Sequence, residues 1–486
     1  GTDNSGNGNN WTENNFNTAT STATTYDIMS DVPTLTDEDT ANYAVLNPLD
    51  AGTLGITVSN ANLNFAVLSA SWTAIRASIG VSSGKWYWEI TPLTAPVNDY
   101  FMNGIKDVTE SIPAGTSQYV GTTSGSYGYY GLSGNKYNNS SFAAYGAAYG
   151  VGDVIGVALD MDAGTLTFYK NNVSQGVAYS GLTGIYAPAL SMQGSSGNTN
   201  TEAINFGQRP FAYTPPTGYK KLNTFNLPDS SIVDSSEYFN TVLYNGAVGN
   251  SPQSITGVGF EPDFVWLKER SSTSAHFLNQ ANDGTVRFMQ SNTTNAEVTD
   301  AQVVGSFDSD GFSVGNSGGS NQSGQTYVAW NWKANGAGVS NTDGTITSQV
   351  SANPTAGFSV VTWTGTGATA TVGHGLGVVP KLYITKDRTN SSTNWHYHTT
   401  QIDGGMDFLF LNTTSTSTSS SLSTPSSTVI TVGGTINTSS ANFVSYVFAD
   451  VEGYSKFGSY TGNGSADGTF VYTGFRPAYV MIKRTN

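Results

Sequence analysis

The chain has 486 residues, and at roughly 100–200 residues per domain this length corresponds to about three domains. It carries 19 Lys and Arg against 34 Asp and Glu, a formal net charge of −15, and only 11% of its residues are charged, against about 25% in an average soluble domain. An acidic chain with dispersed basic residues lacks the cationic surface that phosphate backbones require, so we expect no nucleic-acid binding. No apolar run approaches the roughly 18 residues of a membrane helix, so we expect no membrane insertion.

Aromatic residues make up 12% of the chain, with 9 Trp, 26 Tyr and 23 Phe. So many rings must be buried in a folded core, which argues against disorder. Strong helix formers are scarce, whereas Thr, Val, Tyr, Phe and Gly are abundant. We therefore expect an all-β protein. The absence of cysteine excludes disulfides, thiol chemistry and Cys-ligated zinc within this sequence.

The first 40 residues are rich in Asn, Thr and Ser. Within them Asp3–Asn10 carries the oxygen ligands that calcium prefers, but a Gly/Asn turn is favoured over a calcium loop because no Glu stands at the spacing of a bidentate ligand. The stretch resembles the closing turn of a laminin-G-like module, so residues 1–40 are interpreted as the end of an upstream module or a linker. No cofactor is expected, with a structural calcium ion at Asp3–Asn10 as the alternative left open.

Residues 41–213 contain a dense series of strand signals. Gly84–Ile90 alternates aromatic and polar positions, which predicts a half-buried strand. Gly152–Asp160 and Thr165–Tyr169 read as two strands joined by a hairpin turn at Asp162–Gly164, and Tyr186–Leu190 is a further short strand. Many short strands joined by tight turns predict a β-sandwich or jelly roll.

This block resembles a SPRY domain. The resemblance rests on elements that occur in the family's order: Gly84–Glu89, Tyr145–Gly156, Leu159–Phe168, Asn171–Gly176 and Pro188. It implies a concanavalin-like β-sandwich that serves as a recognition module and not as an enzyme. The usual Asn-Gly turn is replaced by Asn171-Asn172, a small departure because Asn also tolerates positive φ.

From about residue 238 the chain repeats itself. Each unit has an aromatic residue, a Gly-x-x-Pro element whose Pro follows 18, 17 or 17 residues later, and an apolar strand that ends in a basic pair. The opening residues are Tyr244, Trp363 and Tyr460, and the basic pairs are Lys268 with Arg270, Lys386 with Arg388, and Lys483 with Arg484. The third unit ends in a strand without a partner, so we interpret the sequence as a segment of a longer polypeptide.

The predicted fold is a chain of tandem β-sandwich modules, a concanavalin-like jelly roll followed by smaller repeated sandwiches. The expected segments are 1–40, the SPRY-like sandwich at 41–213, a Pro-containing connector at 214–237, repeats at 238–340 and 341–452, and the start of a truncated third repeat at 453–486. This order of modules resembles the long fibre and spike proteins of marine tailed bacteriophages. The resemblance implies a virion appendage that meets the host surface.

The sequence offers no convincing catalytic or metal site. A glycosidase needs two carboxylates about 5–9 Å apart, and no two Glu residues stand at i, i+2 on a predicted strand. Glu89 is interpreted as a framework residue of the aromatic strand. His396 and His398 place two imidazoles on one strand face, but a solvated strand edge is favoured over a metal pair because only Asp403 offers a third ligand. His374 is assigned to a turn before a repeat strand.

Tyrosine is the one feature that points to binding, because six Tyr crowd residues 127–149. Tyr rings stack on the C–H faces of sugars and give rigid contact area at low entropic cost, although most of these rings are expected in the core. Loops 92–100 and 107–119 are further recognition candidates by analogy with the family. The candidate binding residues are Asn98, Asp99, Tyr100, Tyr119, Tyr127, Tyr137 and Tyr145, and no catalytic residue is assigned.

The sequence is therefore interpreted as a non-enzymatic virion structural protein of a phage appendage, located outside the cell. Its expected partners are other virion proteins, a host-surface glycan and further copies of itself, with a homotrimer as the family-like expectation. Two alternatives remain: a polysaccharide depolymerase, which requires a cleft with paired carboxylates, and a cellular adhesin or filament subunit, which would share every module. A purely architectural role without a ligand is a third.

Overall fold

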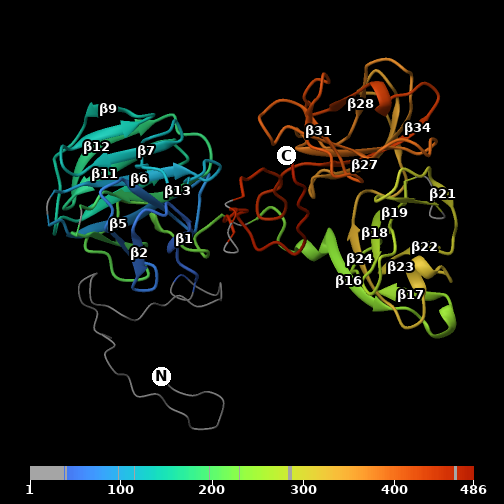
Figure 1. Cartoon of the computed structure of the whole chain (residues 1–486), viewed down its shortest axis with the longest axis horizontal. Helices are drawn as coiled ribbons and strands as arrows, with labels where there is room; N and C mark the ends of the chain where they lie inside the picture. The colour runs from blue at the N-terminus through green and yellow to red at the C-terminus, as the bar shows by residue number, and fades with distance from the viewer. Residues whose placement is uncertain are drawn as a thin grey trace, which may run out of the picture. The chain divides into compact units, whose positions relative to one another are not determined.

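The computed structural model describes residue 38 and residues 41–486, apart from 97, 114, 196, 229, 283–286, 463 and 465–467. The loop Asp3–Asn10, proposed above as a turn or calcium site, lies outside these residues. The described chain is an all-β protein built from antiparallel sheets (Figure 1). None of its helices has the length and apolar character needed to cross a membrane. It divides into two compact units, Gly1–Pro228 with Tyr460–Gly474 (unit 1) and Asp229–Ser459 with Phe475–Asn486 (unit 2).

Unit 1 is a sandwich of two sheets. One sheet has the order β1 (Leu46–Ala51), β4 (Thr73–Ala77), β13 (Tyr186–Met192), β6 (Phe101–Asp107), β7 (Ser126–Tyr130), β8 (Asn135–Asn138) and β9 (Ser141–Ala144). The other has the order β12 (Val173–Ser180), β11 (Thr165–Lys170), β10 (Ile155–Asp160), β5 (Lys85–Thr94), β14 (Asn200–Asn205), β3 (Asn64–Val67) and β2 (Ile56–Ser59), with β15 (Lys220–Lys221) parallel to β5. One hydrophobic core fills the space between the sheets.

Strand β5 shows how the sequence pattern positions this core. Trp86, Trp88 and Ile90 point into the core, as the period of two predicts. The opposite face of the strand is also buried, so the expectation of a half-buried strand is wrong. Tyr87 packs edge-on against Phe211, 5.1 Å between ring centroids. The Glu89 carboxylate accepts hydrogen bonds from the backbone N–H groups of Ala212 and Tyr213. The connector after the sandwich folds back and covers the outer face of β5.

The hairpins of unit 1 use residues that tolerate positive φ. Asn171 and Asn172 have φ of 47° and 67° and join β11 to β12. This confirms that the Asn-Asn pair forms the tight turn in place of Asn-Gly. The pair keeps the two strands antiparallel with a short connection, as a two-residue hairpin requires.

Unit 2 contains two modules whose larger sheets share an order of six strands, to which the second module adds β25 and β26 at one edge. In the first module (residues 239–334) the larger sheet has the order β16 (Phe239–Asn245), β24 (Thr326–Trp332), β18 (Phe264–Glu269), β19 (His276–Gln280), β20 (Arg287–Gln290) and β21 (Val298–Thr299). In the second module (residues 339–449) it has the order β25 (Val339–Asn341), β26 (Ser348–Asn353), β27 (Phe358–Thr364), β34 (Asn442–Phe448), β29 (Leu382–Asp387), β30 (His396–Thr399), β31 (Asp407–Phe410) and β32 (Thr418–Ser419). The smaller sheets are β17 (Gln253–Thr256), β23 (Gly311–Val314) and β22 (Ser306–Asp308) in the first module, and β28 (Ala370–Gly373) and β33 (Val429–Val432) in the second.

The repeated sequence elements occupy equivalent places in the two modules. The strand after each Gly-x-x-Pro element, β18 or β29, is a central strand of its larger sheet. The Lys of each basic pair anchors the turn that follows this strand: Lys268 Nζ donates to the Ser272 carbonyl at 2.9 Å, and Lys386 Nζ donates to the Asp387 carbonyl at 2.7 Å and to Thr393 Oγ1 at 3.1 Å. Burial lowers the pKa of Lys386 to about 8. The lysines of the first two basic pairs are therefore structural parts of the repeat.

The two modules share an aromatic core. Phe264 of the first stacks on Tyr446 of the second, 4.2 Å between ring centroids, within a cluster drawn from both larger sheets. Tyr479, near the C-terminal end of the sequence, packs against Trp332 of this cluster at 5.7 Å. The modules also share an ion pair between Glu297 and Arg388. Unit 2 is therefore one packed body and not two separate sandwiches.

Candidate functional site

Six aromatic side chains form a continuous cluster on the outer face of the β1–β9 sheet of unit 1. Neighbouring ring centroids lie 5.5–6.3 Å apart, and most pairs are edge-on or tilted, as quadrupolar rings prefer. We call this cluster the aromatic patch; its members are Trp72, Tyr100, Tyr119, Tyr130, Tyr137 and Phe142. Five are half-buried and Phe142 is 68% exposed, so ring faces and edges reach solvent.

Glycines in the sheet allow this patch to form. A Cβ on Gly128 would lie 2.4 Å from the carbonyl oxygen of Val120 and 2.9 Å from Met102, so only glycine lets the β6–β7 loop cross the sheet at this point. Val120 is fully buried under the loop, and its N–H donates to Ser191 Oγ at 2.9 Å. The loop thereby brings Tyr119 between Trp72 and Tyr137.

The tyrosines of this patch differ from those of the core in the hydrogen bonding of their hydroxyl groups. Among the described residues, the hydroxyls of Tyr100, Tyr119, Tyr130 and Tyr137 have no hydrogen-bond partner. Burial raises the pKa of Tyr130 to about 12, and the pKa of Tyr137 is also raised by burial, so both hydroxyls stay protonated and able to donate at neutral pH. An exposed ring with an unpaired hydroxyl offers a ligand an apolar face and a polar tip.

Three of the predicted binding residues, Tyr100, Tyr119 and Tyr137, lie together in this patch. Asn98 and Asp99 lie on the loop that leads into β6: the Asn98 carbonyl accepts from the Tyr100 N–H at 2.8 Å. A Cβ on Gly150 would meet the Asp99 carboxylate at 2.5 Å, which places this carboxylate against the backbone of the neighbouring loop.

Tyr127 and Tyr145 lie on the opposite face and pack against the core. The Tyr127 ring lies 4.9 Å from Tyr179 and 5.7 Å from Tyr186. The Tyr145 hydroxyl donates to the Gly176 carbonyl at 2.6 Å and accepts from the Phe168 N–H at 3.2 Å. These two tyrosines are therefore occupied by internal contacts.

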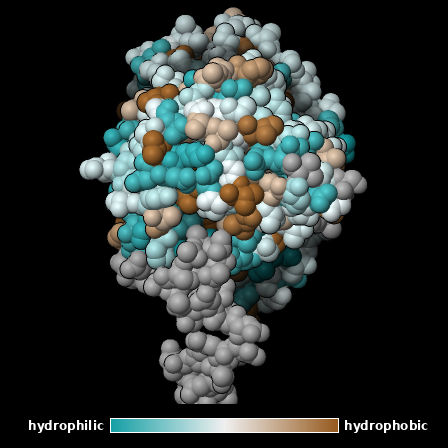
Figure 2. Space-filling view, turned by 90° about the vertical axis from the view of Figure 1, so that its left-hand side faces the viewer, coloured by the Kyte–Doolittle hydropathy of each residue, from teal (hydrophilic) through white to brown (hydrophobic). Residues whose placement is uncertain are grey.

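The sequence analysis did not select Trp72, Tyr130 or Phe142. Strand alternation could have identified Tyr130, because in β7 Tyr127 and Tyr129 face the core while Gly128 and Tyr130 face outward. No comparable signal marks Trp72, which reaches the patch from the loop before β4. Figure 2 shows one face of unit 1, on which small separate apolar areas lie among polar ones.

The described residues contain one close carboxyl pair. Asp407 is buried, and its pKa is raised by burial and by Asp403, with which it shares a hydrogen bond. Two carboxyl groups in direct contact leave no room for a sugar ring and water, for which glycosidases keep them about 5–9 Å apart. This pair does not have the spacing that a glycosidase requires.

The two histidines of β30 are stacked, 5.8 Å between ring centroids, but they are not at a solvated edge. The strand lies between β29 and β31, and the His398 side chain is buried against Tyr383. The expectation of a solvated strand edge is therefore wrong. The described part of the chain holds no group of three or more His, Asp or Glu residues that could bind a metal ion. His374 is buried and accepts the Leu376 N–H at Nδ1, which fits a turn role.

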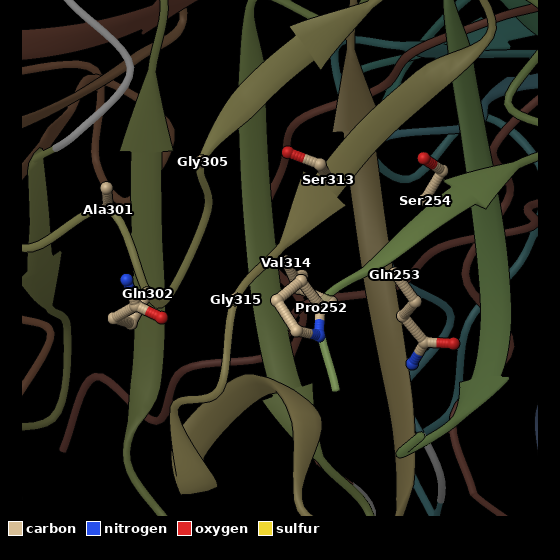
Figure 3. A pocket seen from close by; sticks show the side chains of 9 residues that line it. All are labelled: Pro252, Gln253, Ser254, Ala301, Gln302, Gly305, Ser313, Val314 and Gly315. Carbon is tan, nitrogen blue, oxygen red and sulfur yellow. The ribbon is translucent and has the colours of Figure 1, made fainter. Parts of the chain in front are cut away.

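A shallow depression of about 360 Å³ lies on the smaller sheet of the first module (Figure 3). No titratable side chain lines it; the lining residues are Pro252, Gln253, Ser254, Ala301, Gln302, Gly305, Ser313, Val314 and Gly315. The amides of Gln253 and Gln302 are used internally, since Gln253 Nε2 donates to Asn321 Oδ1 at 2.8 Å and Gln302 Oε1 accepts from the Asn316 N–H at 3.1 Å. The depression offers no acid or base that could activate the hydroxyl groups of Ser254 and Ser313.

The fold is that of an all-β protein in which a β-sandwich precedes two repeated modules. Residues 85–209 match the SPRY domain, which confirms the resemblance of this block. Residues 234–486, more than half of the chain, match the family described as Domain of unknown function (DUF7483), and the chain belongs to this family.

The curated relatives match only a part of this chain. It is 34% identical over 161 residues to the probable ATP-dependent RNA helicase ddx1 of Dictyostelium discoideum and 30% identical over 158 residues to the E3 ubiquitin-protein ligase RKP of Arabidopsis thaliana. These matches cover 33% and 32% of this chain but 19% and 12% of the relatives. The chain therefore spans only a small part of each relative.

Two solved structures are similar to about a third of this chain. The SPRY domain of human HERC1 is 24% identical, with a TM-score of 0.29, and the match covers 33% of this chain and 96% of that domain. The TRIM65 PSpry domain is 17% identical, with a TM-score of 0.28, and the match covers 34% of this chain and 92% of that one.

Proposed function

We propose that this protein is a non-enzymatic recognition protein whose aromatic patch binds a glycan. The observation that carries the proposal is the group of four half-exposed tyrosines whose hydroxyls have no partner among the described residues, beside Trp72 and Phe142. A sugar presents C–H faces that stack on rings and hydroxyls that bond to polar tips. Neither the stacking nor the hydrogen bonds need charged side chains, which agrees with a chain in which only 11% of the residues are charged.

The proposed setting is an extracellular appendage, a tail fibre or spike of a bacteriophage, with the glycan on the host surface. The support is the resemblance in module order together with a cysteine-free, strand-rich sequence that needs no disulfide. Other virion proteins and further copies of this chain are the proposed partners. Single sites of this kind bind weakly, and several tethered copies raise the effective concentration of the second and later contacts.

The activities named for the helicase and the ubiquitin ligase are not proposed for this chain. Its similarity to both proteins is limited to about a third of its own length. Because the similarity covers only this segment, the proposal for this chain is confined to a binding role, which such a segment could perform in each of these proteins.

The experiment that tests glycan binding is a glycan array followed by calorimetry with the best ligand. We expect Trp72→Ala, Tyr119→Ala and Tyr137→Ala each to weaken binding at least tenfold, about 1.4 kcal/mol. Phe142→Ala and Phe225→Ala form a matched pair, because both rings are exposed (68% and 47%) but only Phe142 belongs to the patch. Equal effects of the two substitutions, or an array without any bound glycan, would contradict the proposal.

The depolymerase alternative is tested separately by the release of reducing ends from host polysaccharide. The proposal expects none, and it expects Asp407→Asn to leave glycan binding unchanged. The setting is tested by antibody labelling of native particles: label on a thin tail thread supports a phage appendage, whereas label on a cell-attached filament supports a cellular adhesin.

A further inference from the structure

The two modules of unit 2 differ at one edge of their larger sheets. In the second module β27 pairs with β34 on one side and with β26 on the other. The equivalent strand of the first module, β16, pairs with β24 on one side and is the last strand of its sheet among the described residues. The same module therefore occurs once with this edge covered and once with it open.

The register shows which backbone groups lie on the open edge. The Gly246 N–H donates to the Gln325 carbonyl and the Lys333 N–H to the Tyr238 carbonyl, so even-numbered residues of β16 bond to β24. In an antiparallel pair these groups alternate along the strand. The N–H and C=O groups of Thr241 and Leu243 therefore point away from the sheet. The Thr241 N–H is held by its neighbour Asn240 Oδ1 at 2.9 Å, whereas the N–H and C=O groups of Leu243 have no partner among the described residues.

Side-chain exposure follows the same difference. Leu243 is 59% exposed, whereas Thr362, at the equivalent position of β27, is 8% exposed. Val248, shortly after the strand, is 89% exposed. At the other end of β16 the ring of Phe239 is covered by Tyr479. The Asn245 carbonyl accepts from Gln253 Nε2 at 2.9 Å, so the open part of the edge is Thr241–Leu243, with the exposed side chains of Leu243 and, shortly after the strand, Val248.

Edge strands usually carry features that prevent pairing with another chain, such as charged side chains, Pro, bulges or very short length. β12, an edge strand of unit 1, has register shifts. β21, at the other edge of the sheet that contains β16, has only two residues. β16 has seven residues, a regular register and the uncharged sequence Phe-Asn-Thr-Val-Leu-Tyr-Asn. It has none of these protective features.

We propose that β16 pairs with β16 of a second copy of this chain, antiparallel across a two-fold axis at Val242. In this register Thr241 lies opposite Leu243 of the second copy. The two residues exchange both of their outward N–H···O=C hydrogen bonds, and the two-fold axis generates this pair twice. Val242 lies opposite its own counterpart as a non-hydrogen-bonded pair. The Thr241 N–H exchanges its bond to Asn240 for the carbonyl of the second copy.

The second copy is the occupant that this edge fits best. An isologous contact needs a surface that is complementary to itself. An uncharged strand whose outward backbone N–H and C=O groups alternate along its length is such a surface, because two copies can pair without like-charge repulsion. Pairing would also cover Leu243, as β26 covers the equivalent position of the second module. The resulting two-fold contact differs from the three-fold assembly that the phage resemblance implies.

A cysteine substitution tests the register, because the natural sequence contains no cysteine. Residues in a non-hydrogen-bonded antiparallel pair have Cα atoms about 4.5 Å apart, within the range that a disulfide spans. We expect Val242→Cys in the full chain to give a covalent dimer under mild oxidation. Val298→Cys, on β21 at the other edge of the same sheet, is the matched control and should stay monomeric on a denaturing gel.

Sedimentation velocity tests the contact without a cross-link. We expect the unaltered chain to sediment as a dimer at micromolar concentration, Leu243→Lys to shift it to monomer, and Val298→Lys, on a side chain that is 43% exposed, to leave the dimer intact. Circular dichroism establishes that both lysine variants fold. A monomeric unaltered chain, or a dimer that survives Leu243→Lys without a Val242→Cys cross-link, would overturn the proposal.

Discussion

The side chains of Asn103 and Glu202 join the two sheets of unit 1 through its core. Asn103 Nδ2, on β6, donates to Glu202 Oε1, on β14, at 2.7 Å, and both side chains are fully buried. The remaining oxygens, Asn103 Oδ1 and Glu202 Oε2, have no hydrogen-bond partner in the described chain. A protonated carboxyl group supplies the donor that both oxygens lack, because Oε2–H can bond to Oδ1 in a reciprocal acid–amide pair.

This relationship predicts how the stability of unit 1 depends on pH. Burial raises the pKa of Glu202 to about 8, above its value of about 4.3 in an unfolded chain. The folded state therefore binds the proton more tightly, so the contribution of Glu202 to the free energy of unfolding is greatest below about pH 4 and falls as the pH rises to about 8.

The test is Glu202→Gln, which keeps the shape and supplies the missing donor from its amide. We expect this variant to be about 1–3 kcal/mol more stable than the unaltered chain at pH 9 and to lose the pH dependence of the unit 1 transition. Denaturant unfolding at pH 5, 7 and 9 measures both effects. Glu237→Gln, on an exposed residue, is the control. Equal pH profiles for Glu202→Gln and the unaltered chain would contradict a protonated Glu202.

A second prediction concerns the ion pair between the two modules of unit 2. Arg388 donates from Nε to Glu297 Oε1 at 3.0 Å and from Nη2 to Oε2 at 2.9 Å, and the two side chains are only 8% and 13% exposed. Removal of the carboxylate leaves a buried guanidinium without this partner, so we expect Glu297→Ala to lower the free energy of unfolding by roughly 3–5 kcal/mol. Lys456→Ala, which breaks the more exposed pair with Asp450, should lower it by less than about 1 kcal/mol. Denaturant unfolding compares the two, and equal losses would argue against a structural role for the inter-module pair.

A third prediction tests how the aromatic patch is held. Gly128→Ala places a methyl group against the Val120 carbonyl and Met102, so the β6–β7 loop must move away from the sheet. We expect a loss of roughly 1–3 kcal/mol in stability together with weaker glycan binding, since Tyr119 moves with the loop. Gly458→Ala is the control because a Cβ there meets nothing within 4 Å. Calorimetry and thermal unfolding of the same samples separate the two effects, and unchanged binding would show that the loop does not position the site.

Local patterns were sufficient to predict the all-β class and several individual strands. The period of two in Gly84–Ile90, the Asn171-Asn172 turn and the first two Gly-x-x-Pro elements each depend on residues close in sequence, and each corresponds to a strand or turn in the structure. The strand predicted after the third element is not formed in the described residues. The patch could not be predicted to the same extent. Trp72 meets Tyr119 only because the β6–β7 loop crosses the sheet over Gly128, a non-local event with no periodic signal.

The same limit explains two predictions that were wrong. The strand Gly84–Ile90 was expected to be half-buried, but residues 212 and 213, more than 120 positions after Glu89, return to bond to this carboxylate and cover the second face. The interpretation of Glu89 as a framework residue fits these bonds. His398 was placed at a solvated edge because only Asp403 offered a third metal ligand, but β31 covers that edge and Tyr383 stacks on its ring at 4.8 Å. Burial by distant segments is decided by the fold and not by the local sequence.

The buried histidines of unit 2 give it a pH dependence of the opposite sign to that of Glu202. Burial lowers the pKa of His398 to about 3 and that of His396 to about 4, below the value of about 6.5 in an unfolded chain, and His398 Nδ1 has no partner among the described residues. Below about pH 6.5 the unfolded state therefore binds more protons, so the stability that these two histidines contribute to unit 2 is lost as the pH falls toward 3.

His398→Phe tests this dependence because it retains an aromatic ring against Tyr383 and removes one titrating group. We expect the variant to lose less stability than the unaltered chain when the pH is lowered from 7 to 5, with a difference that grows further at pH 4. Thermal unfolding across this range measures it, and the unit 1 transition serves as an internal reference because Glu202 drives it in the opposite direction. Parallel losses for the variant and the unaltered chain would show that other groups govern the acid response of unit 2.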